Sequence, residues 1–149
     1  MSIREFTVND YPAVLEIYSK AKLDELRYEN NIFELLPLNK DDVRLAELME
    51  SEIYLYDNGG VLGYGAICNK EIRALFVLPE SRGVGVGKVL LEFLISQVSG
   101  VVSLYVADSN YPAKNLYENY GFKVTETFET TYNGISVFAN RMIRAINSE

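Results

Sequence analysis

Five residues in the middle of the chain, Gly83 to Gly87, alternate glycine with valine and stand between two apolar runs. Glycines this close together weaken a regular element, because each one loses more conformational freedom on folding than any other residue. The apolar runs predict a buried strand that stops at Pro79 and a helix that follows the glycines. Such a strand-to-helix turn leaves several backbone N–H groups facing one space at the positive end of the helix dipole, which favours binding of a phosphate group.

Two familiar phosphate-binding motifs do not fit these residues. A P-loop requires a glycine four residues ahead of Gly-Lys-Ser/Thr, but Arg82 stands at that position and Val89 follows Lys88, so no hydroxyl is available for magnesium. A dinucleotide-binding fingerprint requires Gly-x-Gly-x-x-Gly, and Lys88 stands where the third glycine should be. Both motifs are therefore excluded.

The pattern that does fit is Arg-x-x-Gly-x-Gly, at Arg82, Gly85 and Gly87. It resembles the coenzyme A signature of the GNAT superfamily, the acyl-CoA-dependent N-acetyltransferases. The resemblance covers residues 71–122, which contain a strand, a Pro-Glu step, the signature with its helix, and a later Asn-to-Tyr-Gly-Phe segment in the order that the family shows. It implies one GNAT-like α/β domain over residues 1–149, in which a central, mostly antiparallel mixed sheet is flanked by about four helices and splays apart at the coenzyme site.

The periodicity of the chain agrees with this fold class. The predicted order is strand-helix-helix-strand-strand-strand-helix-strand-helix-strand-strand. Helices are expected over residues 11–27 (capped by Asn9 or Asp10), 38–51 (capped near Asn39), 85–100, and between Asn110 as N-cap and Gly121. Strands are expected over residues 2–8, 52–57, 60–69, 71–78, 101–108, 123–134 and 135–143, with hairpin turns at Asn58-Gly59-Gly60 and Asn133-Gly134.

Composition removes several classes of function. The formal charge of −7, without a cluster of Lys or Arg, argues against nucleic acid as a partner. No apolar run reaches the roughly 18 residues that a membrane helix needs, and the first residues do not read as a secretion signal, so we expect no membrane partner and a cytoplasmic location. The single cysteine, Cys68, cannot form a metal cluster alone, and nothing in the sequence marks it as an acyl-accepting nucleophile. Histidine, the commonest general base and zinc ligand, is absent. No metal is expected.

The resemblance implies acetyl-CoA as the co-substrate and assigns residues to it. The backbone amides from Gly83 to Lys88 would bind the pyrophosphate, with Arg82 at the entrance of the loop, and the backbone of residues 75–77 would pair with the pantetheine arm as an added strand does. Asn110 would lie beside the coenzyme, a role that is compatible with serving as a plain helix cap, and Lys88 would add charge near the phosphates or simply be solvated. The expected coenzyme residues are Leu75, Phe76, Val77, Arg82, Gly83, Val84, Gly85, Val86, Gly87, Lys88, Asn110 and Tyr117.

The chemistry requires a donor for the carbonyl oxygen, an acid and a base. The family suggests the Val77 amide as the donor. An alkylamine with a pKa of about 10.4 has to lose a proton at neutral pH, which is worth roughly 4–5 kcal/mol, and without histidine a carboxylate is the obvious acceptor. Tyr117 holds the family's position for the acid that protonates the departing thiolate, with Tyr120 as the alternative; either ring could instead serve in packing.

The family places the base at either of two positions. One family position for it is filled by Tyr105 in this chain. Glu71 holds the other, six residues before Val77, and an even spacing on a strand predicts the same face. Glu71 could instead be a plain exposed charge at the start of a strand. Bulk water, Glu25 or Glu34 would then be the alternative base.

The sequence leaves the acceptor open. A small-molecule amine and a peptide or protein amine both fit the family, and a non-catalytic acyl-CoA-binding or regulatory domain is the alternative function. Specificity is expected in two variable segments, residues 23–39 and the hairpin around residues 130–136, where Tyr28, Phe33 and Tyr132 could line a cleft. Both a monomer and a homodimer are compatible with the sequence.

Overall fold

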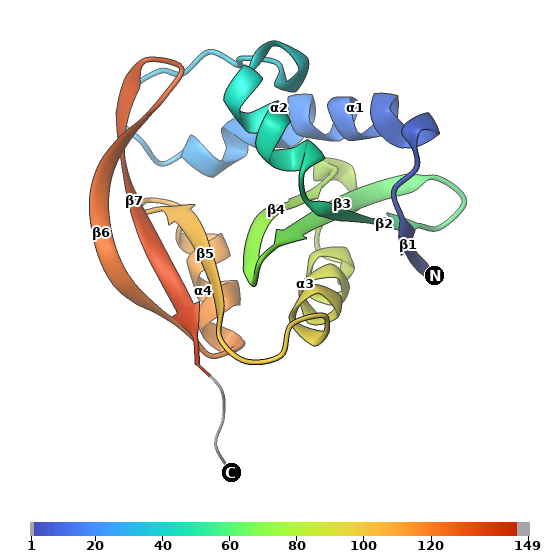
Figure 1. The fold of residues 1–149 in the computed structure, drawn as a ribbon. Helices are drawn as coiled ribbons and strands as arrows, with labels where there is room; N and C mark the ends of the chain where they lie inside the picture. The colour runs from blue at the N-terminus through green and yellow to red at the C-terminus, as the bar shows by residue number, and fades with distance from the viewer. Residues whose placement is uncertain (1, 146–149) are drawn as a thin grey trace.

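The computed structural model describes residues 2–145, and these form one seven-stranded sheet in the order β1-β2-β3-β4-β5-β7-β6 (Figure 1). The strands are β1 (Ser2–Glu5), β2 (Glu52–Asp57), β3 (Val61–Cys68), β4 (Glu71–Val77), β5 (Val102–Ala107), β6 (Phe122–Tyr132) and β7 (Ile135–Arg144). The α-helices in these residues are α1 (Tyr11–Ala21), α2 (Asp42–Met49), α3 (Val86–Ser96) and α4 (Tyr111–Asn119). The predicted fold class and the predicted order of strands and α-helices are confirmed.

The predicted helix ends were less accurate than the order. The helix expected over residues 11–27 changes at Lys22 into a 3₁₀ turn, η2 (Lys22–Leu26). The next helix is capped by Asp41, whose side chain accepts a hydrogen bond from the Arg44 amide, while Asn39 lies in a separate 3₁₀ turn, η3 (Leu38–Lys40). Two further 3₁₀ turns are η1 (Val8–Asp10) and η4 (Pro79–Ser81). Among the residues described, no helix is long and apolar enough to cross a membrane.

The sheet divides between β4 and β5, the one neighbouring pair that runs parallel. Their register has only two positions, Glu71 opposite Ser103 and Ile72 opposite Leu104, and beyond these the two strands separate. The predicted splay is therefore present. In Figure 1 the gap lies between the half-sheet formed by β1 to β4 and the half-sheet formed by β5, β7 and β6.

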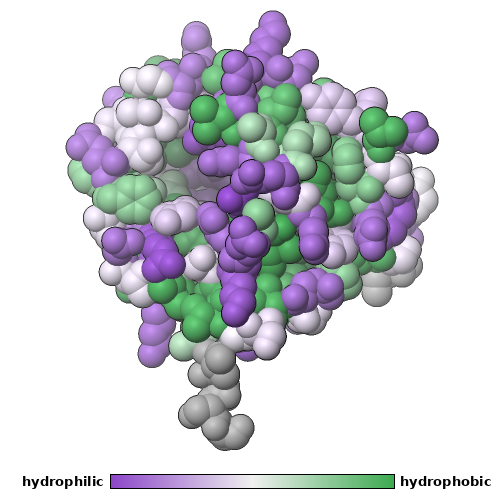
Figure 2. Space-filling model, viewed as in Figure 1, coloured by the Kyte–Doolittle hydropathy of each residue, from purple (hydrophilic) through white to green (hydrophobic). Residues whose placement is uncertain are grey.

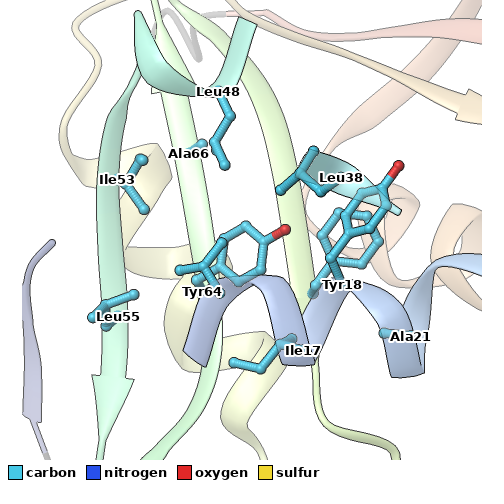
Figure 3. Packing of buried hydrophobic residues seen from close by; sticks show 11 residues of the cluster. Ile17, Tyr18, Ala21, Leu38, Leu48, Ile53, Leu55, Tyr64 and Ala66 are labelled. Atoms are coloured by element: carbon cyan, nitrogen blue, oxygen red, sulfur yellow. The ribbon is translucent and has the colours of Figure 1, made fainter. Parts of the chain in front are cut away.

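Two apolar cores fix the helices on opposite faces of the sheet. Figure 3 shows one of them, in which Ile17 and Tyr18 of α1 pack with Leu48 of α2 onto Leu55 and Tyr64 of the sheet. The second core joins α3 and α4 to β4, β5 and β7. Full burial of a side chain of this size contributes about 1.5–3 kcal/mol, so these cores hold the elements that line the gap in place.

One inserted residue changes the direction of the side chains along β4. Ala66 pairs with Ala74 and Ile67 pairs with Ile72, so Arg73 has no partner on β3 and forms a β-bulge. Ile72 belongs to the core on the α3 side, whereas Ala74 packs against the core on the α1 side. The alternation of faces is therefore reversed at the bulge.

A segment that we call the strap, residues 27–37, connects η2 with η3 and crosses to the tip of the β6–β7 hairpin. The Leu36 amide donates to the Tyr132 hydroxyl (2.9 Å), and the Asn133 side chain donates to the Glu34 carbonyl (3.0 Å). Phe33 packs on Tyr132 with 6.4 Å between ring centroids. The strap thus ties the N-terminal helices to the far half of the sheet.

Candidate active site

The glycine loop presents a row of free backbone amides at the start of α3. Gly83 and Gly85 have φ angles of 82° and 92°, which side chains rarely adopt, and Gly85 is the N-cap of the helix. The amides of residues 83–88 donate to no other backbone or side-chain group in the described chain; the first helical hydrogen bond runs from Val89 to Gly85. The space beside the loop is open, since a Cβ added at Gly83 or Gly85 would meet no atom within 4 Å.

The edge of β4 that faces the gap supplies further backbone groups. The Leu78 amide donates to Leu62 of β3 (2.9 Å), and alternation along an antiparallel pair then directs the backbone of Phe76 to β3 as well. The N–H and C=O groups of Leu75 and Val77 accordingly face the gap. The expected pairing of residues 75–77 with a ligand is thus restricted to Leu75 and Val77, because the backbone of Phe76 is engaged within the sheet.

A cavity of about 1110 Å³ occupies the gap between the half-sheets. Its size slightly exceeds the range of about 300–1,000 Å³ that is typical of small-molecule sites. All of the residues expected to hold the coenzyme line it, except Val84, whose side chain is exposed. Figure 2 shows a hollow on this face of the molecule, bordered by hydrophilic side chains on one side and by paler and hydrophobic ones on the others.

Asn110 lies at the N-cap of α4 and is buried at the cavity wall. Its side chain makes no capping hydrogen bond and none with any other described residue. Its amide is therefore able to bond to a ligand. Asn110 is the N-cap residue of α4, as predicted, although its side chain does not make the capping hydrogen bond.

Tyr117 and Tyr120 are in different surroundings. Tyr117 is buried, lines the cavity and packs on Phe122 (5.8 Å between ring centroids). Burial raises the pKa of Tyr117 above its ordinary value of 10.0, and the negative charge of Glu25 adds to this effect, so the hydroxyl keeps its proton at neutral pH. Tyr120 lies outside the cavity, and its hydroxyl donates to Glu92 (2.6 Å).

Glu71 lies outside the cavity, at the end of β4 that is still paired with β5. Its carboxylate is 3.6 Å from the Arg73 side chain. The expectation that Glu71 shares a face with Val77 is wrong, because the bulge at Arg73 lies between them and reverses the alternation. Cys68 pairs with Glu71 at the same end of the sheet and is also outside the cavity.

Three other glutamates do line the cavity. Glu25 of η2 forms an ion pair with Lys22 (2.8 Å), Glu47 comes from α2, and Glu126 comes from β6. The sequence analysis gave Glu25 only as an alternative base. It did not indicate Glu47 or Glu126, because whether these side chains reach the cavity depends on how α2 and the hairpin pack across the gap.

Of the aromatic residues expected to line a cleft, only Tyr132 does so. Tyr28 instead packs on Tyr111 of α4, with 5.8 Å between centroids, and Phe33 packs behind Tyr132 in the strap.

Comparison with known proteins places this geometry in a family. The family model for the acetyltransferase (GNAT) domain matches residues 50–124. A peptidyl-lysine N-acetyltransferase, YjaB of Salmonella typhimurium, is 33% identical over 69 residues; the match covers 46% of this chain and 47% of YjaB, about half of its length. An uncharacterized N-acetyltransferase of Archaeoglobus fulgidus is 29% identical, over 85% of this chain and 96% of its own.

A solved structure extends the likeness to the whole fold. The putative acetyltransferase YncA of Salmonella typhimurium, determined with its cofactor acetyl-CoA, superimposes with a TM-score of 0.74 at 21% identity, covering 100% of this chain and 95% of that one. Together with the family match, which spans half of the sequence and contains both the glycine loop and the splayed strands, this leads to one conclusion: the chain belongs to the GNAT family of acetyltransferases.

Proposed function

We propose that the protein transfers an acetyl group from acetyl-CoA to an amine. The observation that carries the proposal is the row of free amides at residues 83–88, which opens into the cavity beside the unpaired edge of β4. A row of fixed N–H donors at a helix N-terminus suits a pyrophosphate, and an unpaired strand edge suits the amide-containing pantetheine arm.

The residues present fit acetyl-CoA. Residues 83–88 would bind the pyrophosphate, Leu75 and Val77 would pair with the pantetheine arm, and Asn110 would donate or accept from the opposite wall. Glycine at residues 83 and 85 leaves the backbone uncovered at the point where the phosphates approach. When bound, the coenzyme supplies an activated acetyl group on sulfur.

Different groups of this chain then act as the donor to the carbonyl oxygen, the acid and the base of the transfer. The amide of Val77 donates to the carbonyl oxygen as it gains charge. Tyr117 gives its proton to the sulfur when the carbon–sulfur bond breaks, and its raised pKa keeps that proton available at neutral pH. A carboxylate takes the proton that the amine loses. Glu71 is the residue that the family resemblance suggests, and Glu25 is the candidate that lines the cavity.

The matched region does not decide the acceptor. Residues 50–124 exclude α1, η2, the strap, α2 and most of the β6–β7 hairpin, all of which contribute residues to the cavity wall. The name of YjaB makes a peptide lysine one candidate, and a small-molecule amine is the other.

The proposal is tested by two measurements on the full chain. Isothermal titration calorimetry with acetyl-CoA tests coenzyme binding, and release of the coenzyme A thiol in the presence of a panel of amines and lysine peptides tests transfer. Binding together with amine-dependent thiol release supports the proposed function. Binding without release for any acceptor would instead identify a non-catalytic acyl-CoA-binding domain, and absence of binding would reject both.

A further inference from the structure

A small recess of about 90 Å³ lies between α1, α2 and β4. It shares four wall residues with the main cavity, Lys22, Arg44, Glu47 and Phe76, and so adjoins it. These residues lie on the α1 and α2 side of the sheet, whereas the glycine loop belongs to α3. The recess is therefore placed to receive part of an acceptor and not part of the coenzyme.

Two tyrosine hydroxyls at the recess have no hydrogen-bond partner among residues 2–145. Tyr18 is 3% exposed, and its buried hydroxyl forms no hydrogen bond with a described residue. Tyr64 is 1% exposed, and its hydroxyl likewise forms none of the hydrogen bonds found among residues 2–145. Figure 3 shows the two hydroxyls on either side of Leu38, which also lines the recess. The buried Tyr18 hydroxyl is therefore a group to which water or a ligand can bond.

Cationic side chains supply the other donors. Arg44 uses only Nη1 in its ion pair with Asp41 (3.2 Å), so its Nε–H and Nη2 groups have no acceptor among the described residues. Lys22 and Arg44 both approach the ring of Tyr132, at 5.2 and 5.1 Å from its centroid. Arg73 completes the cationic wall. Guanidinium and ammonium groups can only donate, so a group bound among them has to be an acceptor.

Most of the carboxylates near these cations lie outside the recess. Glu25 pairs with Lys22, Asp41 with Arg44, and Glu50 and Glu71 with Arg73, and none of these four lines the recess. Glu47 is the carboxylate that does, on the wall shared with the main cavity, and its side chain forms no ion pair with a described residue. The recess thus offers donors inside and a carboxylate at its mouth.

We propose that the recess binds the carboxylate of a small zwitterionic acceptor, an amino acid, whose ammonium group lies toward Glu47 and Glu25. The inference rests on the proposed transfer to an amine and names the class of that amine. Arg44 and the hydroxyls of Tyr18 and Tyr64 bond to the carboxylate, and the amine is left in the main cavity on the Leu75–Val77 side.

The test uses matched sets of acceptors in the thiol-release assay. Each set contains a free α-amino acid, the corresponding amide and the corresponding decarboxylated amine, and a lysine peptide is added for comparison. For at least one set the free amino acid should give a kcat/KM at least about tenfold higher than its amide and its amine, the size of effect expected from losing a charge-assisted hydrogen bond. Equal values within every set, or reaction of the lysine peptide alone, would overturn the proposal.

Tyr18→Phe separates binding from structure. Because the Tyr18 hydroxyl has no partner in the described part of the chain, its removal should leave the melting temperature unchanged or raise it, yet KM for the amino acid should increase several-fold. Tyr54→Phe is the matched control, since the Tyr54 hydroxyl bonds to Glu52 outside the recess and its loss should change neither KM nor kcat. Arg44→Gln should abolish the preference for the free amino acid over its amide. An unchanged KM in Tyr18→Phe, together with a retained preference in Arg44→Gln, would contradict the assignment.

Binding to the recess can be measured without turnover. With coenzyme A present, the preferred amino acid should raise the melting temperature of the wild-type protein and should raise that of Arg44→Gln much less. Failure of every amine to release thiol would reject the proposed function, but a melting shift that depends on Arg44 would still support the recess as an amino-acid site. Absence of any shift with the free amino acids would reject the recess itself.

Discussion

The Arg82 guanidinium lies 2.6 Å from the carboxylate of Asp24, so the first residue of the glycine motif is bonded to η2, 58 positions earlier in the chain. The two side chains are 40% and 39% exposed. An ion pair this exposed contributes only about 0–1 kcal/mol to stability. Its effect is expected on ligand binding instead, because both residues line the cavity where the coenzyme phosphates are proposed to lie.

Asp24→Asn should therefore tighten coenzyme binding. Removal of one carboxylate next to an anionic ligand, with Arg82 released to face it, should lower Kd about two- to fivefold at low salt, and the gain should shrink at high salt as the charges are screened. Calorimetry at two salt concentrations measures both effects. Glu16→Gln is the control, since Glu16 pairs with Lys20 on α1 outside the cavity. Weaker binding in Asp24→Asn would mean that Asp24 positions Arg82 for the phosphates.

Gly85→Val should weaken coenzyme binding by more than about tenfold, because a side chain would cover the amides. Nothing in the protein obstructs the new Cβ, so the structural cost is the left-handed backbone, about 1–2 kcal/mol. Gly59→Val is a matched control: Gly59 has a φ of 79° and equally open space, in the β2–β3 turn. The two variants should lose similar stability, while only Gly85→Val loses affinity. Equal affinities would exclude the loop as the phosphate site.

Tyr117→Phe should lower turnover by about 10²–10⁴ with little change in coenzyme affinity, since only a hydroxyl is removed from a positioned acid. Tyr120→Phe should leave turnover nearly unchanged, because its hydroxyl bonds to Glu92 away from the cavity. Steady-state kinetics at saturating acetyl-CoA distinguish the two variants. The role assigned to Tyr117 fails if its variant turns over at the parental rate.

Glu25→Gln and Glu71→Gln compare the two candidate bases. The rate at saturating acetyl-CoA should rise with pH through one ionisation when a carboxylate or the amine itself has to lose its proton. The substitution that removes the base should flatten this limb and leave coenzyme binding intact. From the cavity lining, we expect the larger effect in Glu25→Gln. An unaltered profile in both variants would assign the proton to bulk water.

Stability should fall above about pH 10, the ordinary pKa of tyrosine. Burial is the first cause that raises the pKa values of Tyr18, Tyr64 and Tyr117. As the pH rises, the unfolded chain releases these protons first, so the folded state is favoured fully below that pH and progressively less above it. Each residue contributes up to about 1.4 kcal/mol per pH unit. Urea unfolding of the parent and of Tyr64→Phe should give a shallower alkaline slope in the variant; parallel slopes would contradict the prediction.

The conformation of the glycine loop could be predicted because its information is local. Arg82, the glycines, the preceding strand and the following helix are adjacent in sequence, and their conformations depend mainly on themselves. The order of the elements was accurate for the same reason. The end of the first helix was not, because Leu26 is buried against Tyr132 and Val137 of the distant hairpin and the backbone tightens at Lys22 to reach them.

The face of Glu71 illustrates what a single strand cannot reveal. Residues 71–77 alternate regularly when they are considered alone, and an even spacing from Val77 gives one answer. The bulge at Arg73 exists only in the pairing of β4 with β3. It puts Glu71 and Val77 on opposite faces, and nothing in the sequence of β4 itself indicates this. Glu47 and Glu126 were missed for a related reason, since α2 and β6 meet the cavity only after the whole domain has packed.

The two-position contact between β4 and β5 has a mechanical consequence. With so short a ladder, few backbone hydrogen bonds join the two half-sheets along that line, and the space between them is held mainly by side-chain packing and by the strap. A coenzyme arm paired with Leu75 and Val77 would supply the bonding that β5 does not, and would stiffen the sheet along the same line. We therefore expect an ordered sequence of substrate addition, in which the coenzyme enters first and sets the width of the passage that the amine then occupies.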